Sequence, residues 1–218
     1  MSVSASDVND SVFGFNWLLM VISAVSIFFS VVLCLQLYKK SYSSSFERRY
    51  DSIGGWLILV GIGIVLTPLT LTFQVTKLYY EEINIDYFYY YFNERSQYYE
   101  PLKGYYVIIT NFGNMFLIVA SIFLIILFFQ KKNSFRIYYT GYRIFNVVFL
   151  IIDLIMIYTF AGTPVSSEDK ILINGQTAAV TRMVVQACIW IPYIWLSERS
   201  RHTFVTDSDR KTNMPQLD

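Results

Sequence analysis

The chain has 218 residues, of which 55% are hydrophobic and 15% charged, and its net charge is +1. Because a soluble domain carries about 25% charged residues, this composition is typical of a protein that crosses a membrane several times. The near-zero net charge gives no bulk attraction to nucleic acid, so we expect no nucleic-acid partner. The single histidine, and two cysteines that both lie in apolar stretches, favour neither a metal site nor a disulfide framework, and we expect no cofactor.

Five apolar runs of about twenty residues each are long enough to cross a hydrocarbon core of about 30 Å. They predict an all-α protein, a polytopic transmembrane helix bundle with five spans. The runs cover residues 17–37, 54–74, 105–129, 144–161 and 179–196. The first run has full spanning length and follows an acidic tail, 1–16, which indicates a retained helix and not a cleaved signal peptide.

The first two runs carry small or weakly polar faces. Residues Ser23, Ser26, Ser30 and Cys34 follow helical spacing in the first run, which predicts close packing on that side. In the second run we expect Gly61 and Gly63 to permit close backbone approach, and Pro68 to kink the helix. One face of this run collects further small or polar residues, and we expect it to point into the bundle: Gly63, Thr67, Thr70 and Gln74.

The segment 77–104 is unusually rich in tyrosine and is predicted to lie outside the cell. One interpretation is an interfacial segment on the outer leaflet, because tyrosine prefers that boundary. The other is an aromatic cradle for a ligand. The first interpretation is favoured, since anchoring at the interface is the commonest role of tyrosine in membrane proteins.

The last three runs contain the polar residues of the predicted site. Polar groups are costly in lipid unless they are paired, so we expect these side chains to point into the bundle. Asp153 lies near the middle of the fourth run and Arg182 near the outer end of the fifth, where an ion pair between them is possible. The candidate intramembrane polar site consists of Asp153, Arg182, Gln186, Asn111 and Asn114, and a second helix kink is expected at Pro192.

Lysine and arginine are unevenly distributed between the loops. The segments 38–53, 130–143 and 197–218 hold twelve of them, whereas the alternate segments hold four. By the positive-inside rule, the N-terminus lies outside and the C-terminus in the cytoplasm. The predicted organisation is an external tail (1–16), an extra first helix with a basic cytoplasmic loop (17–49), a four-helix membrane domain (50–205) and a cytoplasmic tail (206–218).

Two stretches resemble a known family. The first is Gly54-Gly55-Trp56-Leu57, continuing to Pro68. The second is Ile189-Trp190-Ile191-Pro192-Tyr193, followed by Thr203-Phe204. They are similar to the start and the close of the bacterial membrane-protein family catalogued as domain of unknown function 2569. The resemblance covers about residues 50–205, and the first helix and the tyrosine-rich loop look like additions. Ser200 and His202 interrupt the family's basic pattern before Thr-Phe. The resemblance implies a multi-pass protein of the bacterial cytoplasmic membrane and brings no catalytic residues.

No motif for nucleophilic or metal-assisted catalysis is present, and an intramembrane protease would need a Ser/His pair or two aspartates within the spans. We therefore expect a non-enzymatic protein that acts as an accessory or interaction protein of the membrane. The alternative is a small transport or permeation protein, or an envelope sensor, that uses Asp153 and Arg182. The expected partners are the lipid bilayer and either another membrane protein or a second copy of this chain.

Overall fold

A computed structural model of the chain describes residues 17–41, 54–81, 91–97, 99–160 and 167–204. Within these residues the fold is all-α and has no strand, and five helices are long and apolar enough to span a membrane. The predicted fold class is thereby confirmed. The predicted tails 1–16 and 206–218 and the middle of the tyrosine-rich segment lie outside the described residues. The helices are α1 (Trp17–Lys40), α2 (Trp56–Glu81), α4 (Pro101–Phe129), α5 (Phe135–Phe160), α6 (Ser167–Leu196) and α7 (Glu198–Thr203).

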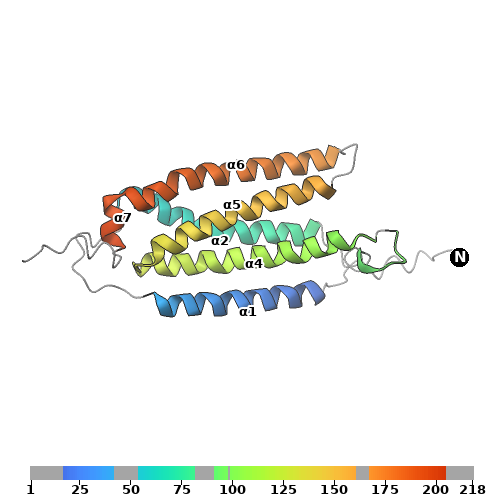
Figure 1. The fold of residues 1–218 in the computed structure, drawn as a ribbon, viewed down its shortest axis with the longest axis horizontal. Coiled ribbons are helices and arrows are strands. Elements are labelled where there is room, and N and C mark those ends of the chain that lie inside the picture. The colour runs from blue at the N-terminus through green and yellow to red at the C-terminus, as the bar shows by residue number, and fades with distance from the viewer. Residues whose placement is uncertain (1–16, 42–53, 82–90, 98, 161–166, 205–218) are drawn as a thin grey trace, which may run out of the picture.

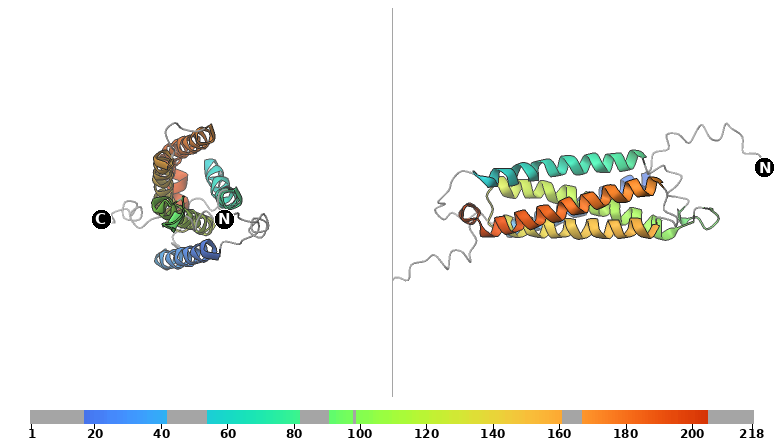
Figure 2. Two further views of the ribbon diagram at one scale, coloured as in Figure 1. Left: turned by 90° about the vertical axis from the view of Figure 1, so that its right-hand side faces the viewer. Right: turned by 90° about the horizontal axis from the view of Figure 1, so that it is seen from above.

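Helix α4 is the centre of the bundle (Figure 1). It packs against α1, α2 and α5, whereas α6 packs against α5 and carries the short helix α7 at its end. Seen end-on, α6, α5, α4 and α1 follow one another in a row, and α2 lies to one side of α4 (Figure 2). Three helices, α1, α2 and α6, each pack along a single long helix, whereas α4 and α5 each pack along more than one.

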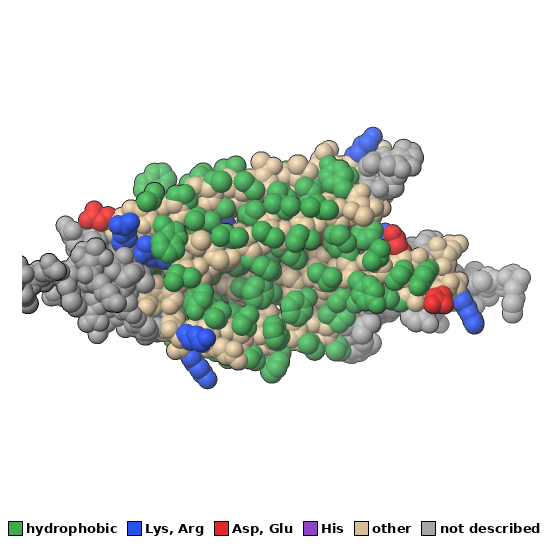
Figure 3. All heavy atoms as spheres, in the orientation of Figure 1, with side chains coloured by type: hydrophobic (Ala, Val, Ile, Leu, Met, Phe, Trp, Pro, Cys, Tyr) green, Lys and Arg blue, Asp and Glu red, His purple; other side chains and the backbone are tan. Residues whose placement is uncertain are grey.

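The outer surface agrees with a membrane environment. Hydrophobic side chains cover the face of the bundle shown in Figure 3, and the charged side chains gather toward its two ends. Because lipid offers no hydrogen bonds to a protein backbone, long continuous helices with apolar surfaces are the expected solution. The end at which α1, α4 and α6 terminate is called the α7 end below.

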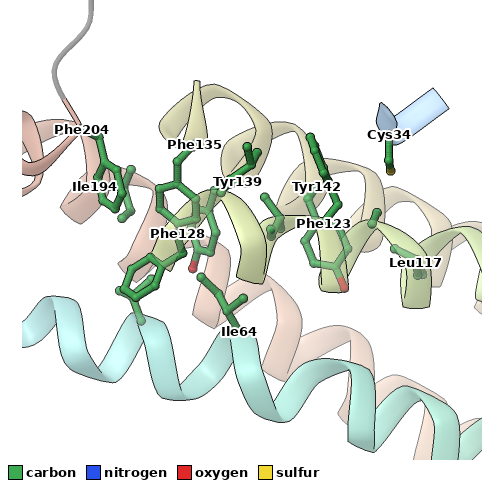
Figure 4. Close-up of a cluster of buried hydrophobic side chains, with 14 of the residues drawn as sticks. Cys34, Ile64, Leu117, Phe123, Phe128, Phe135, Tyr139, Tyr142, Ile194 and Phe204 are labelled. Carbon is green, nitrogen blue, oxygen red and sulfur yellow. The ribbon is translucent and has the colours of Figure 1, made fainter. Parts of the chain in front are cut away.

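An aromatic cluster fixes the α7 end (Figure 4). Phe204, which follows α7, is fully buried, and its ring centroid lies 4.5 Å from that of Phe135 and 5.8 Å from that of Phe128. On α2, Gly61 makes room for the Phe128 ring: a Cβ at this position would lie 2.8 Å from a ring carbon. Thus α2, α4, α5 and the residue after α7 share one core, and the predicted close approach at Gly61 is confirmed.

The two ends of the family-like region also meet here. Gly55 has a positive φ of 59°, a conformation in which glycine is strongly favoured. A Cβ on Gly54 would lie 2.6 Å from an Nη atom of Arg199, so the guanidinium group rests against the Gly54-Gly55 backbone. The pair of glycines before α2 therefore accommodates an arginine from α7, 145 residues later in the chain.

Two predicted helix starts were wrong. Helix α5 begins at Phe135 and not at residue 144, so Arg136 and Arg143 lie in a helix and not in a loop. Helix α6 begins at Ser167 and not at residue 179, so most of the predicted external loop 162–178 is helical. In both cases polar or turn-forming residues, such as Asn174-Gly175, lie inside a helix. A continuous helix satisfies all backbone N–H and C=O groups internally, which a turn within lipid could not do.

The predicted inward-facing polar side of α2 was also wrong. The residues that α2 buries are mainly apolar, whereas Thr70 and Gln74 are exposed. The hydroxyl of Thr67 donates to the carbonyl of Gly63 at 2.7 Å, which satisfies it within the helix. A Cβ on Gly63 would meet nothing within 4 Å, so the expected close approach at this glycine is absent. Helices α2 and α6 continue through Pro68 and Pro192. A bend of the helix axis at each proline stays a prediction.

Candidate functional site

Asn111 joins α4 to α1. Its side chain is buried, and its Nδ2 donates to the Oγ of Ser23 at 3.0 Å. One turn further along α1, the fully buried Ser26 donates from its Oγ to the carbonyl of Phe112 at 3.1 Å. The predicted small face of α1 therefore packs on α4, with Ser26, Ser30 and Cys34 buried. This contact is hydrogen-bonded packing between neighbouring helices and lies apart from the other polar groups.

Asp153 accepts hydrogen bonds from two uncharged side chains on neighbouring helices. The hydroxyl of Tyr106 on α4 donates to its Oδ1, and Nε2 of Gln176 on α6 donates to its Oδ2 at 2.5 Å. The Tyr106 ring packs at 5.5 Å from that of Phe160. The carboxylate thus ties α4, α5 and α6 together about two turns from the end of α5.

Arg143 is a second charged group inside the bundle, and its side chain is 6% exposed. Its Nε donates to the hydroxyl of Tyr139 and its Nη1 to Oε1 of Gln186, both at 3.1 Å. The guanidinium carbon also lies 5.2 Å from the centroid of the Tyr139 ring, a cation–π distance. No carboxylate pairs with Arg143 in the described part of the chain.

The contacts of Asp153 and Arg143 follow one antiparallel register. Moving ten residues along α5, from Asp153 to Arg143, corresponds to moving ten residues along α6, from Gln176 to Gln186. A glutamine amide can donate to an anion or accept from a cation, so the same residue type complements both charges. Helix α5 therefore carries the two charges and α6 supplies a neutral amide to each.

Near the α7 end a third cation is held by aromatic stacking. Arg136 is 4% exposed, and its guanidinium carbon lies 4.6 Å from the centroid of the Trp195 ring. The indole Nε1 of Trp195 donates to the Thr140 hydroxyl at 2.9 Å. Stacking on an indole suits the weakly hydrated, planar guanidinium group, which explains how α5 can begin with a buried arginine.

Arg182 lies at a different position from the one predicted. It is the sixteenth of the thirty residues of α6, about 22 Å from Ser167 and about 21 Å from Leu196 at 1.5 Å per residue. By the register of the α5–α6 contacts it lies level with Val147, the midpoint of α5. Its side chain is exposed, and its Nε donates to the carbonyl of Ala178 at 3.2 Å. The structure does not bring it to Asp153, so the predicted ion pair is absent.

Arg182 belongs to a continuous exposed face of α6, which we name the α6 seam. Its members recur with alternating spacings of four and three residues, the pattern of a helix that packs along another helix. The seam consists of Ile171, Gly175, Ala178, Arg182, Val185 and Ile189, all of them exposed. It lies on the opposite side of α6 from the buried positions Ile173 and Ile194, and thus faces away from α5.

The exposure of Arg182 is the least expected feature of the bundle. A charged residue at the centre of a spanning helix costs about 2.5–3.5 kcal/mol even on insertion scales. Long cationic side chains reduce this cost by reaching the interface only when they lie near a helix end. Arg182 is about 21 Å or more from both ends of α6, and a bilayer centred on this helix would leave its guanidinium group in hydrocarbon.

The five residues of the predicted site therefore separate. Asp153, Gln186 and Asn111 have separate partners and do not contact one another, Asn114 is half-buried on α4, and Arg182 faces outward. Sequence reasoning missed Tyr106, Gln176 and Arg143, because all three were placed at or beyond the ends of the predicted helices. The signal for Arg143 was present: Phe135, Tyr139 and Tyr142 continue the helical period of α5 ahead of residue 144. In the described part of the chain, no three His, Cys, Asp or Glu side chains gather to hold a metal ion.

The comparisons with known proteins give one match. A family model described as "Protein of unknown function (DUF2569)" matches residues 50–205, which span α2 to α7 and leave α1 outside the match. No curated protein and no solved structure matches the chain.

Proposed function

Because this chain belongs to the DUF2569 family and is a multi-pass membrane protein, we propose that it is a non-enzymatic interaction protein whose α6 seam docks another integral membrane protein. The observation that carries the proposal is the exposed Arg182 at the midpoint of α6. A partner on the seam would remove this charge from lipid and offer it hydrogen bonds.

The arrangement of the helices supports this proposal. Helix α6 packs along α5 alone, and its apolar span is 6% buried, compared with 44% for α4. In lipid, the exposure of apolar side chains carries no penalty, but the exposure of Arg182 does. The seam is therefore the one face in the described spans where a fully charged side chain points outward at mid-depth.

Location and orientation form part of the proposal. The α7 end carries Lys39, Lys40, Lys131 and Lys132 in addition to Arg199 and Arg201. We place this end in the cytoplasm and the protein in a bacterial cytoplasmic membrane, since short loops rich in lysine and arginine stay on the cytoplasmic side.

The experiment is a native mass measurement of the full chain extracted with its surrounding lipid. The expected species is a stoichiometric complex with a second membrane protein. Replacing Val185 in the seam by Trp should abolish the complex, because the larger ring blocks close approach to Gly175-Ala178-Arg182. The matched control is Val148→Trp, about one helical turn from Val185 in depth and on an exposed face of α5, and it should leave the complex intact. A chain that is monomeric in every membrane extract contradicts the proposed function.

A further inference from the structure

The geometry points to a partner of defined chemistry: we infer that the α6 seam binds a single transmembrane helix that carries an Asp or Glu near the middle of its span. The inference rests on the proposed function and names the class of residue that the partner must provide. The carboxylate would accept hydrogen bonds from the guanidinium group of Arg182. It would thereby place the partner helix at one depth along α6.

Charge is the first argument. In the described part of the chain Arg182 has no carboxylate partner, and its Nε donates to the Ala178 carbonyl within the same helix. That bond uses Nε, so the two terminal amino groups of the guanidinium are the donors that a partner would occupy. A carboxylate matches two adjacent guanidinium donors in a bidentate geometry, which a hydroxyl or an amide cannot reproduce.

Shape is the second argument. One and two turns before Arg182 the seam is built from Ala178 and Gly175, and a Cβ on Gly175 would meet nothing within 4 Å. Small residues at a helix surface allow another helix backbone to approach closely. On the other side of Arg182, Val185 and Ile189 are 52% and 56% exposed and offer apolar area. The seam thus has small residues on one side of Arg182, where a helix can approach closely, and larger apolar residues on the other side.

A second copy of this chain fits the charge poorly. Asp153 is the one acidic residue in the five described spans. It lies level with Gln176, six residues from Arg182, so in a copy inserted in the same direction the two charges differ in depth by about 9 Å. Asp153 also accepts bonds from Tyr106 and Gln176 within its own subunit. A different protein with a central carboxylate fits the charge better.

The test uses full-length protein in phosphatidylcholine vesicles and synthetic leucine–alanine transmembrane peptides. One peptide carries Glu at its centre, a second carries Gln there, and a third carries Glu two turns from one end. A central residue has the same depth in either peptide orientation, so the direction of insertion does not affect the result. Association is measured by energy transfer to an acceptor on the peptide from a donor dye on the native Cys188, which is exposed on α6 outside the seam. A second protein carries the donor at Val148→Cys on α5, with Cys188→Ser. Both proteins carry Cys34→Ser.

The central-Glu peptide should bind at least about tenfold more tightly than the other two peptides, with more transfer from position 188 than from position 148. Arg182→Gln should remove this preference, and Arg182→Lys should keep most of it. Charge reversal is the decisive arm: Arg182→Glu should prefer a peptide with a central Lys. Retained preference in Arg182→Gln, or no preference in the unaltered protein, overturns the inference. So does self-association through the seam that excludes the peptide, because the occupant would then be a second copy.

Failure of this inference is separable from failure of the proposed function. If the partner complex seen by native mass measurement survives Arg182→Gln but is lost in Val185→Trp, the seam is a docking face and the carboxylate requirement is wrong. If both variants keep the complex, the seam itself is wrong.

Discussion

At the scale of single residues, Asp153 and Arg143 are stabilised by hydrogen bonds with uncharged side chains and, within the described residues, not by ion pairs. Asp153 depends on Gln176 and Tyr106, and Arg143 depends on Gln186 and Tyr139. A charge that loses such a partner inside a low-dielectric interior keeps its desolvation cost, about 1–3 kcal/mol or more. The consequence is that the amide partners on α6 are as important to stability as the charged residues that they contact.

Gln176→Leu should therefore lower the free energy of unfolding by about 1–3 kcal/mol, because it leaves Oδ2 of Asp153 without its donor. Combining it with Asp153→Leu should cost less than the sum of the two single changes, since the charge is then absent. The measurement is unfolding of the four variants in a denaturing-detergent titration. Strict additivity of the two changes would show that the contact contributes nothing to stability.

The matched control for that cycle is Arg182. It is exposed and does not contact Asp153, so Arg182→Gln and Asp153→Asn should be additive to within about 0.5 kcal/mol. A larger coupling would restore the ion pair that the sequence suggested and would argue against the outward orientation of Arg182.

Gly113 tests the packing between α4 and α5. A Cβ at this position would lie 2.2 Å from a ring carbon of Phe149, which is nearer than atoms can approach. Gly113→Ala should therefore destabilise the bundle by about 1–3 kcal/mol through forced displacement of the ring. Phe149→Leu, which shortens the opposing side chain, should recover part of the loss when combined with it. An unchanged midpoint in Gly113→Ala would show that α5 moves freely at this contact.

At the scale of helices, α7 is a short clasp helix: together with Phe204 it anchors the C-terminal end of α6 to the aromatic core. It is six residues long and too short to be stable alone, so its position depends on Phe204 and on the contact of Arg199 with Gly54-Gly55. Phe204→Ala should cost about 3–5 kcal/mol, because it empties a site between Phe128 and Phe135. Limited proteolysis at the α7 end should accelerate in parallel. A variant that resists protease as well as the unaltered protein would show that the clasp is dispensable.

The existence of the five spanning helices could be predicted from the sequence, because an apolar run of about twenty residues has few alternatives in lipid. The ends of α1 and α4 were also close to their predicted positions. The starts of α5 and α6 could not be predicted, since Arg136 stacks on a tryptophan 59 residues away and Asn174-Gly175 resembles a turn. The errors in the helix starts also affected the predicted site. Asp153 and Arg182 were identified as intramembrane charges, but their partners could not be predicted because these depend on where the helices begin.

At the scale of the whole molecule, the bundle is an open row of helices that ends at α1 on one side and at α6 on the other, and not a closed ring. The proposed orientation of this row, with the α7 end in the cytoplasm, rests on the basic residues at that end. Reporter fusions at Ser44, Ser134 and Asp207 should report the cytoplasm, and fusions at Asn93 and Ser167 the exterior. An exterior signal at Ser134 would contradict the orientation, because this residue lies in the short turn between α4 and α5.

The most direct measurement of the central claim is photo-crosslinking in the native membrane from a photoreactive residue at Val185, compared with one at Val148. Both positions are exposed and differ in depth by about one helical turn, but only the first lies in the α6 seam. The docking of a partner on the seam predicts a discrete adduct with a second membrane protein from position 185 and only lipid adducts from position 148. Lipid adducts alone from both positions, or the same protein adduct from both, would contradict it.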